Sequence, residues 1–242
     1  MAGDTLNHPL PVIELHGVTK GFQSGDQWVP VLKGVEFQAM DGTLTMIVGP
    51  SGCGKTTLLS IIAGTLHPDA GHVRVFGHEV EQLDAHQLNS FRARDVGFVF
   101  QQFHLISTLT VQENVMIPKL IQGASEGAAA KAASDVLEQV GLSHMVKRRP
   151  NQLSGGEQQR VAIARGLVHQ PRVLICDEPT SALDSETGKK IVKLIIDIAR
   201  RPGRCLVIVT HDSRIYHYAD MIAQMEDGVI KAMQTPDQLQ GH

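Results

Sequence analysis

Short runs of β-branched and other apolar residues recur along the chain, mostly bounded by Gly, Pro or Asp, and each run predicts a β-strand. These runs are residues 12–15, 43–48, 73–76, 96–100, 173–176, 205–210 and 222–225. Apolar residues with helical spacing lie between the later runs, at residues 55–63, 83–94, 111–120, 128–140, 156–170 and 186–199. Strands that alternate with helices predict an α/β fold with a mostly parallel sheet and helices packed on it.

The pattern also predicts which strands are central and where the chain leaves the sheet. Residues 173–175 and 206–209 are apolar at every position, which is typical of strands buried on both faces. Residues 102–170 hold three helical patterns and no strand, so we expect a helical subdomain inserted into the α/β core. The expected single domain covers residues 12–232, with its core in 12–101 and 171–232 and with tails at 1–11 and 233–242.

Composition narrows the class of protein. The 242 residues include 22 Lys+Arg and 25 Asp+Glu, a net charge of −3 that gives no indication of nucleic-acid binding. Three widely spaced cysteines without a C-x-x-C pair argue against a disulfide framework and against structural zinc. No stretch approaches the roughly 18 apolar residues of a membrane span. If the protein acts at a membrane, we expect another chain to cross it.

The strongest chemical signal is a glycine-rich loop between the strand at 43–48 and the helix that begins near Lys55. It fits G-x-x-x-x-G-K-[ST], the pattern of loops whose backbone N–H groups cradle phosphates at a helix N-terminus. Lys55 would reach the β and γ phosphates of a nucleotide, and the Thr56 hydroxyl would coordinate Mg²⁺. A glycine-rich turn without a ligand is the alternative, which the flanking elements disfavour. The loop comprises Gly49, Pro50, Ser51, Gly52, Cys53, Gly54, Lys55 and Thr56, followed by Thr57.

Two carboxylates and a histidine follow other strands at the same predicted edge of the sheet. Asp177 and Glu178 come directly after the run at 173–176, and His211 directly follows the run at 205–210. Because ligands gather at the carboxyl ends of parallel strands, we expect these side chains beside the phosphate loop. There Asp177 would hold Mg²⁺, Glu178 would activate the attacking water, and His211 would polarise that water or contact the γ-phosphate. A helix cap or a solvated loop is the plain alternative for each.

A second helix end suited to phosphate follows at residues 153–160, Leu-Ser-Gly-Gly-Glu-Gln-Gln-Arg. Ser154 and Glu157 have the spacing of a capping box ahead of a helical run, so helix initiation is the plain role. The Ser154 hydroxyl and the N–H groups of Gly155 and Gly156 also form a positively polarised end with no bulky side chain in the way. One chain therefore has two helix N-termini suited to phosphate, the one that follows the glycine-rich loop and the one at residues 154–156, although only one nucleotide is expected.

Together these residues resemble the ATP-binding-cassette (ABC) ATPases, over about residues 12–232. Residues 153–160 look like the signature motif of that family. By resemblance, Phe22 corresponds to the aromatic that stacks on adenine, and Gln101 to the Gln that contacts Mg²⁺ and water. Asp184 ends the stretch that corresponds to the D-loop, and His211 corresponds to the switch histidine. The family's fold implies a P-loop NTPase core with an N-terminal antiparallel β subdomain and the inserted helical subdomain.

The resemblance also implies ATP and Mg²⁺ as cofactors and a homodimer that closes head to tail on two ATP molecules. The phosphate loop of one copy and Ser154 with Gly156 of the other would grip the same ATP. Residues 97–101, 103–115 and 153–165 are similar to the lipoprotein-release and macrolide-export subgroup (LolD/MacB-like). That subgroup implies ATP hydrolysis coupled to transport through an FtsX-like transmembrane permease. It also implies a periplasmic adaptor where the system has one, and a peripheral location on the cytoplasmic face of the inner membrane.

Other functions carry the same motifs. The sequence also fits an ATP-driven clamp that transmits a conformational signal to a membrane protein and transports no solute, as in cell-division relatives. It fits an importer ATPase as well. A DNA-repair or ribosome-associated cassette would have a coiled-coil insertion or a second cassette, and a small-molecule P-loop kinase has no use for the second helix end. In the ABC family the permease docks between core and helical subdomain, which is expected here around residues 103–115, with Phe103, Leu105 and Ile106 as candidate contacts.

Overall fold

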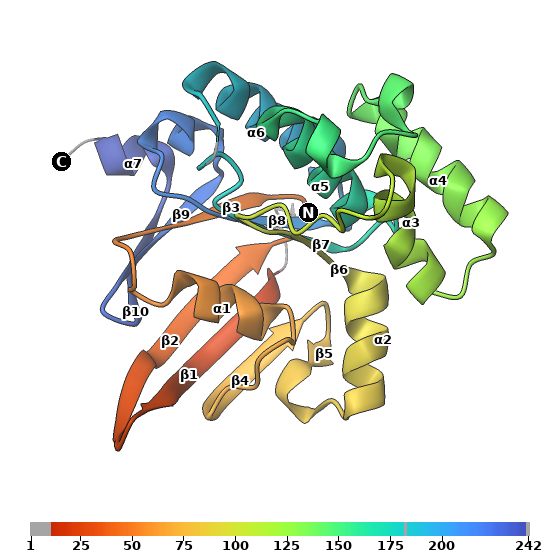
Figure 1. Ribbon diagram of the computed structural model, residues 1–242. Coiled ribbons are helices and arrows are strands. Elements are labelled where there is room, and N and C mark those ends of the chain that lie inside the picture. Colours follow the sequence, from red (N-terminus) through yellow and green to blue (C-terminus); the bar gives the residue numbers. More distant parts are fainter. Residues whose placement is uncertain (1–10, 182, 241–242) are drawn as a thin grey trace, which may run out of the picture.

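The computed structural model of the chain describes residues 11–181 and 183–240, in two sheets with helices around them (Figure 1). The strands are β1 (Pro11–Ser24), β2 (Gln27–Met40), β3 (Leu44–Val48), β4 (Ala70–Val75), β5 (His78–Glu79), β6 (Val96–Val99), β7 (Val173–Asp177), β8 (Cys205–Val209), β9 (Met221–Glu226) and β10 (Val229–Gln234). The α-helices are α1 (Lys55–Ile62), α2 (Ala85–Asp95), α3 (Val111–Ile121), α4 (Glu126–Gln139), α5 (Gly155–Leu167), α6 (Ser185–Ala199) and α7 (Pro236–Gln240). Most of the expected amino-terminal tail, residues 1–10, and Ala182 of the expected D-loop lie outside the described residues.

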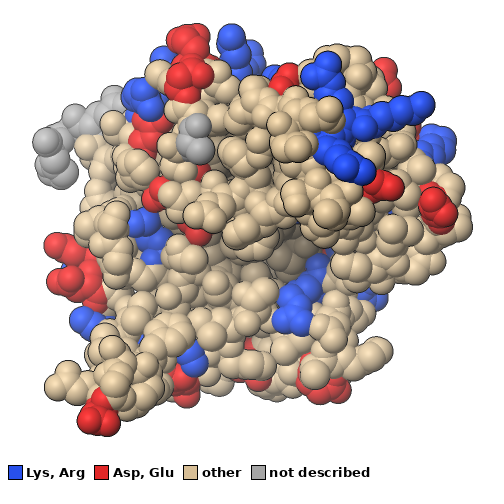
Figure 2. Space-filling view, in the orientation of Figure 1, with Lys and Arg blue, Asp and Glu red and all other residues tan. Residues whose placement is uncertain are grey.

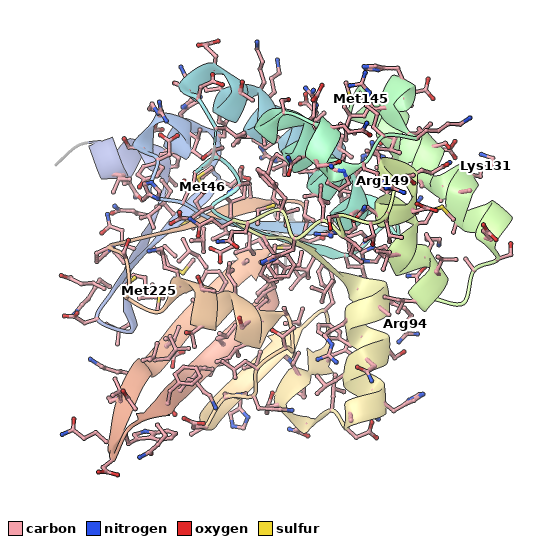
Figure 3. All side chains as sticks on the ribbon, viewed as in Figure 1. Met46, Arg94, Lys131, Met145, Arg149 and Met225 are labelled. Atoms are coloured by element: carbon pink, nitrogen blue, oxygen red, sulfur yellow. The ribbon has the colours of Figure 1, made fainter. Side chains whose placement is uncertain are left out.

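The six-stranded sheet runs in the order β10-β9-β3-β8-β7-β6. Its strands pair in parallel except for β10, which is antiparallel to β9. Every residue of β3, β7 and β8 is buried, as expected for central strands. The sheet separates two apolar cores, with Met225 on the α1 side and Met46 on the α6 side (Figure 3). The predicted α/β fold with a mostly parallel sheet is confirmed.

The four-stranded sheet, in the order β2-β1-β4-β5, is antiparallel throughout. Its inner face shares one core with α1 and the six-stranded sheet, in which Ile13 and Phe37 join Leu59 and Ile47. The pairing of β1 with β2 shifts register between Lys20 and Gly21, which leaves a bulge in β2 beside them. This sheet is the N-terminal antiparallel β subdomain that the family resemblance implied.

Helices α3, α4 and α5 form a separate subdomain with an apolar core of its own. Ala129 and Ala133 are fully buried there, because small residues let α4 pack closely against its neighbours. The predicted helical insertion is therefore present, and it packs beside the six-stranded sheet through α5 (Figure 1). Among the described residues, no helix combines the length and the apolar character that crossing a bilayer requires.

All seven predicted strands and all six predicted helices are present, but β2, β5, β10 and α7 were not predicted. β2 was missed because it is an edge strand whose first residues are exposed and because Pro30 and Gly34 interrupt its pattern. The chain also stays ordered beyond the expected boundary at residue 232, since β10 continues to Gln234 and α7 follows. At the other end, β1 begins at Pro11, inside the expected tail.

Substituting Gly97 by Ala is expected to lower the free energy of unfolding by about 1–3 kcal/mol or more, because overpacking a filled core forces the backbone to move. Gly97 lies on β6, where an added Cβ would stand 2.2 Å from the carbonyl oxygen of Gly166 on α5. Urea unfolding measures the change. The matched control is Gly127→Ala on α4, where an added Cβ meets nothing within 4 Å and stability is expected to hold or rise slightly.

Candidate active site

One cavity, of about 320 Å³, lies where the carboxyl ends of β3, β6, β7 and β8 meet. It collects residues from parts of the chain that are far apart in sequence, as expected for the edge at which parallel strands end. The lining residues are Val31, Ser51, Gly52, Gly54, Lys55, Thr56, Thr57, Gln101, Asp177, Glu178 and Val209. The phosphate loop, the two carboxylates and Gln101 therefore share one cavity.

The loop from Gly49 to Gly54 ends in a helix terminus that is open to an anion. Gly54 precedes α1 with a left-handed φ of 108°, no side chain caps the helix, and no acidic residue lies in its first turn. The free N–H groups and the positive end of the helix dipole therefore face the cavity without an internal partner. Lys55 is 7% exposed, and its Nζ donates to the carbonyl oxygens of Gly49 at 2.9 Å and Pro50 at 2.8 Å. This places its ammonium group at the loop.

Thr56 and Asp177 meet across the cavity. The Thr56 hydroxyl donates to Asp177 Oδ2 at 3.0 Å. Burial raises the pKa of Asp177 above its usual range, while the hydrogen bond from Thr56 opposes the rise. A cation beside the carboxylate would stabilise its charged form. Hydroxyl, carboxylate and amide oxygens from Thr56, Asp177 and Gln101 suit Mg²⁺, which takes few protein ligands and completes its shell with phosphate and water. The described residues contain no cluster of three or more His, Cys, Asp or Glu able to hold a metal.

Glu178 and His211 form a second pair at the same edge. His211 Nδ1 lies 3.1 Å from Glu178 Oε1, a hydrogen bond in which the ring N–H donates to the carboxylate. The Glu178 side chain is 17% exposed and that of His211 is 65% exposed. Glu178 has a left-handed φ of 46°, which is costly for a residue with a Cβ and is typical of functional positions. Its backbone is fixed by hydrogen bonds from its N–H to Val209 and from Ser181 to its carbonyl oxygen.

Three residues of the predicted loop do not line this cavity. Gly49 and Pro50 face a hollow on the other side of the loop, which His211 also lines. The Cys53 side chain is buried in the apolar core, so only its backbone can serve a ligand. Conversely, Val31 and Val209 line the cavity although the sequence analysis did not predict them as site residues. Nothing in the sequence marks Val31, because it reaches the cavity through the bulge in β2.

Comparison with known proteins agrees with this geometry. A model described as "ABC transporter" matches residues 32–181. The chain is 42% identical over 220 residues to the lipoprotein-releasing system ATP-binding protein LolD of Bacteroides thetaiotaomicron, which covers 91% of this chain and 99% of LolD. The chain belongs to the ABC transporter family. The predicted family and LolD/MacB-like subgroup are confirmed, and this ABC protein is an ATPase that works in transport.

Two further relatives extend the comparison. This ABC ATPase is 40% identical over 226 residues to the macrolide export ATP-binding/permease protein MacB of Wolinella succinogenes, covering 93% of this chain and 35% of MacB. It thus spans about a third of MacB's length. The solved dimeric structure of MJ0796, a bacterial ABC transporter cassette, has a TM-score of 0.86 to this ABC ATPase. The two are 38% identical, and the match covers 93% of this chain and 98% of that one. The P-loop NTPase fold of an ABC cassette is confirmed.

The residues of this ABC ATPase that are expected to form the signature motif lie outside the cavity. Ser154 is the N-cap of α5, and the predicted capping box with Glu157 is present: the Ser154 N–H donates to Glu157 Oε2 at 2.7 Å. Gly155 and Gly156 form the first turn of the helix, where an added Cβ on Gly156 would stand 2.9 Å from Thr187. The N-termini of α5 and α6 therefore lie side by side.

Asp184 caps the neighbouring helix α6. Its Oδ1 accepts from the backbone N–H groups of Glu186 at 3.1 Å and Thr187 at 3.0 Å. A hydrogen bond from the Thr187 side chain, together with these backbone hydrogen bonds, holds the pKa of Asp184 below its usual range. Asp184 does not line the cavity within its own chain. The N-terminus of α6, which Asp184 of the expected D-loop caps, therefore lies next to Gly156 of the expected signature motif, and neither residue lines the cavity that holds the phosphate loop.

Phe22 lies near the end of the ribbon formed by β1 and β2. It is 41% exposed and pairs with Val29, which is 43% exposed. It does not line the cavity, although Val31 on the same ribbon does. In this ABC ATPase the expected base-stacking residue is therefore held on a different sheet from the one that carries the phosphate loop.

Proposed function

We propose that this chain is the ATPase subunit of a membrane exporter of the lipoprotein-release or macrolide-export type. It works as a homodimer held on the cytoplasmic face of the inner membrane by an FtsX-like permease, with a periplasmic adaptor where the system has one. The observation that carries the proposal is the single cavity that joins the phosphate loop, the Thr56–Asp177 pair and Glu178. Identity over nearly the full length of LolD supports the subgroup.

Phosphate binding uses the backbone N–H groups of residues 51–56 together with the Lys55 ammonium group. Thr56, Asp177 and Gln101 would hold Mg²⁺ beside the phosphates. When bound, Mg²⁺ neutralises charge on the phosphate oxygens. The hydrogen bond from Thr56 to Asp177 and the buried β7 strand fix these ligands, so they need little rearrangement when ATP enters.

Hydrolysis needs a base that takes a proton from the attacking water. Glu178 is the carboxylate that lines the cavity at the end of β7 without bonding to Thr56. Its Oε1 accepts from His211, which orients the carboxylate and leaves Oε2 for the water. The water oxygen forms a bond to the γ-phosphorus as the bond to the β–γ bridging oxygen breaks, and the proton passes to Glu178. Gln101 and His211 position the water.

Dimerisation follows from the two separate helix ends. Ser154, Gly155, Gly156 and Asp184 lie outside the cavity of their own chain, so they are free to complete the cavity of a second copy. A head-to-tail pair has twofold symmetry and would close on two ATP molecules. The dimeric arrangement of the solved MJ0796 cassette supports this proposal.

The permease would dock in a groove of about 540 Å³ between the core and the helical subdomain. Figure 2 shows a hollow in this region, with Lys and Arg side chains along its margin. Apolar side chains line the groove, among them Phe98 and Ile121, the latter 68% exposed. An exposed apolar surface with arginines at its edge fits a partner segment that is apolar with acidic or carbonyl groups. Of the three candidate contacts expected from the sequence, Phe103 and Leu105 are half-buried and only Ile106 is exposed, and none of the three lines this groove.

The test is affinity purification of the Glu178→Gln variant from detergent-solubilised membranes with Mg²⁺ and ATP, followed by mass spectrometry. We expect an FtsX-like permease with a large extracytoplasmic domain to co-purify. Adding Ile121→Asp to the Glu178→Gln variant should prevent the permease from co-purifying, because docking would bury the new charge in the groove. In a chain that keeps Glu178, Ile121→Asp alone should leave the ATPase activity of the purified subunit unchanged.

The matched control is Met233→Asp, which changes an exposed apolar residue of β10 outside the groove and is expected to keep the permease bound. If only soluble proteins co-purify, the proposed pairing with an FtsX-like permease is wrong. A permease that comes without any transport substrate or adaptor, in a strain with a division defect, would instead favour the ATP-driven clamp.

A further inference from the structure

The carboxylate of Asp69 holds the strand segment that leads to Phe22. Asp69 Oδ1 accepts from Lys20 Nζ at 2.6 Å, and Oδ2 accepts from the backbone N–H of Gly21 at 2.7 Å. The Asp69 backbone N–H in turn donates to the carbonyl oxygen of Thr19 at 2.9 Å. The two residues immediately before Phe22 are therefore bonded to one side chain from another part of the chain.

The ion pair continues to the aromatic ring. The Lys20 ammonium group stands 5.8 Å from the centre of the Phe22 ring, within the range of a cation–π contact. The Lys20 side chain is only 15% exposed, and that of Asp69 is 34% exposed. The hydrogen bonds from Lys20 and Gly21 hold the pKa of Asp69 below its usual range. Asp69 thus holds the Lys20 ammonium group near the Phe22 ring and also fixes the backbone that precedes Phe22.

Trp28 supports the same segment from the other face of the ribbon. Gln23 pairs with Trp28 and Phe22 pairs with Val29, so Phe22 and Trp28 point to opposite faces. An added Cβ on Gly21 would stand 2.5 Å from the indole, which therefore lies directly against the Gly21 backbone. With Asp69 and Trp28 in place, the segment has contacts on both sides, and the Phe22 ring has a fixed direction.

Asp69 also connects this segment to the phosphate loop. The helix α1 begins at the loop with Lys55 and ends at Ile62, and Asp69 lies in the short connection between α1 and β4. One continuous segment therefore holds the phosphates at its start and the support of Phe22 at its end. We infer that Asp69 is a positioning residue for base recognition, which sets the Phe22 ring relative to the phosphate loop. This inference rests on the proposed role of Phe22 in stacking on adenine.

The experiment compares the affinity of each variant for ATP with its affinity for tripolyphosphate, which offers phosphates to the loop but has no base. Phe22→Ala is expected to weaken ATP binding about 5- to 100-fold, the usual range for loss of base stacking. Asp69→Ala is expected to weaken it about 3- to 10-fold, a part of that effect. Asp69→Asn keeps an oxygen for the Gly21 N–H and should lie between Asp69→Ala and the wild type. Tripolyphosphate affinity should stay unchanged in all three, which also shows that the loop remains folded.

The matched control is Asp135→Ala, which breaks the exposed Lys131–Asp135 ion pair of 2.9 Å on α4. Lys131 lies across the molecule from the β1–β2 ribbon (Figure 3), so neither affinity should change. The double variant Phe22→Ala with Asp69→Ala should bind ATP no more weakly than Phe22→Ala alone, because Asp69 acts through Phe22.

Three results would overturn the inference. The first is a double variant whose loss of ATP affinity is the sum of the losses in the two single variants. The second is an Asp69→Ala variant that loses as much affinity for tripolyphosphate as for ATP. The third is a Phe22→Ala variant whose ATP affinity is unchanged. Each of these leaves ATP binding by the wild-type chain intact. A wild-type chain that binds neither ATP nor tripolyphosphate would refute the proposed function itself, so the two failures are distinguishable.

Discussion

Replacing Glu178 by Gln is expected to lower the rate of ATP hydrolysis by about 10²- to 10⁴-fold, because an amide cannot take the proton from the attacking water. ATP affinity should remain at the wild-type value, since Lys55, Thr56 and the loop N–H groups are unchanged. Unhydrolysed ATP would then keep two subunits closed, so Mg²⁺ and ATP should shift the variant from monomer to dimer in size-exclusion chromatography. Phosphate release measures the turnover.

The control for this prediction is Glu138→Gln, which removes the same charge from the exposed surface of α4. Its turnover and its elution with ATP should match the wild type. The assignment of Glu178 as the base is wrong if Glu178→Gln still hydrolyses ATP at the wild-type rate. A slow variant that remains monomeric with ATP would instead contradict the proposed head-to-tail pair.

Replacing Lys55 by Ala is expected to weaken ATP binding about 10- to 100-fold, because hydrogen bonds from a charged group contribute roughly 1.5–3 kcal/mol each. Turnover should fall as well, since the lost ammonium group also stabilises the charge that develops on the transferred phosphoryl group. Equilibrium binding of ATP and of tripolyphosphate measures the effect, and both ligands should lose affinity together. This pattern differs from that of Phe22→Ala, which should affect ATP alone.

Lys55 also donates to the carbonyl oxygens of Gly49 and Pro50, so its loss affects the loop itself. Thermal unfolding without nucleotide separates the loss of the phosphate contact from the loss of the hydrogen bonds within the loop. Without nucleotide, only the hydrogen bonds within the loop can affect the unfolding temperature. The control is Lys190→Ala, which removes an exposed lysine of α6 and should change neither affinity nor stability. Unchanged tripolyphosphate affinity in Lys55→Ala would refute the phosphate-binding role.

Local signals in the sequence predicted most of the elements. The capping box of Ser154 and Glu157 marked the start of α5 correctly, because it depends on residues three positions apart. The apolar run before Asp177 predicted a central strand, because a strand buried on both faces cannot alternate with polar residues. The edge strands β2 and β10 were missed because partial exposure removes that pattern.

By itself, the sequence determined the α/β class, the phosphate loop and the family, since each depends on residues adjacent in the chain or on a fixed order of motifs. Only the tertiary structure decided which groups meet. Val31 enters the cavity through a bulge, and Asp69 reaches Gly21 across 48 positions of sequence. Such contacts depend on strand register and on how the two sheets pack, and no local pattern encodes either of them.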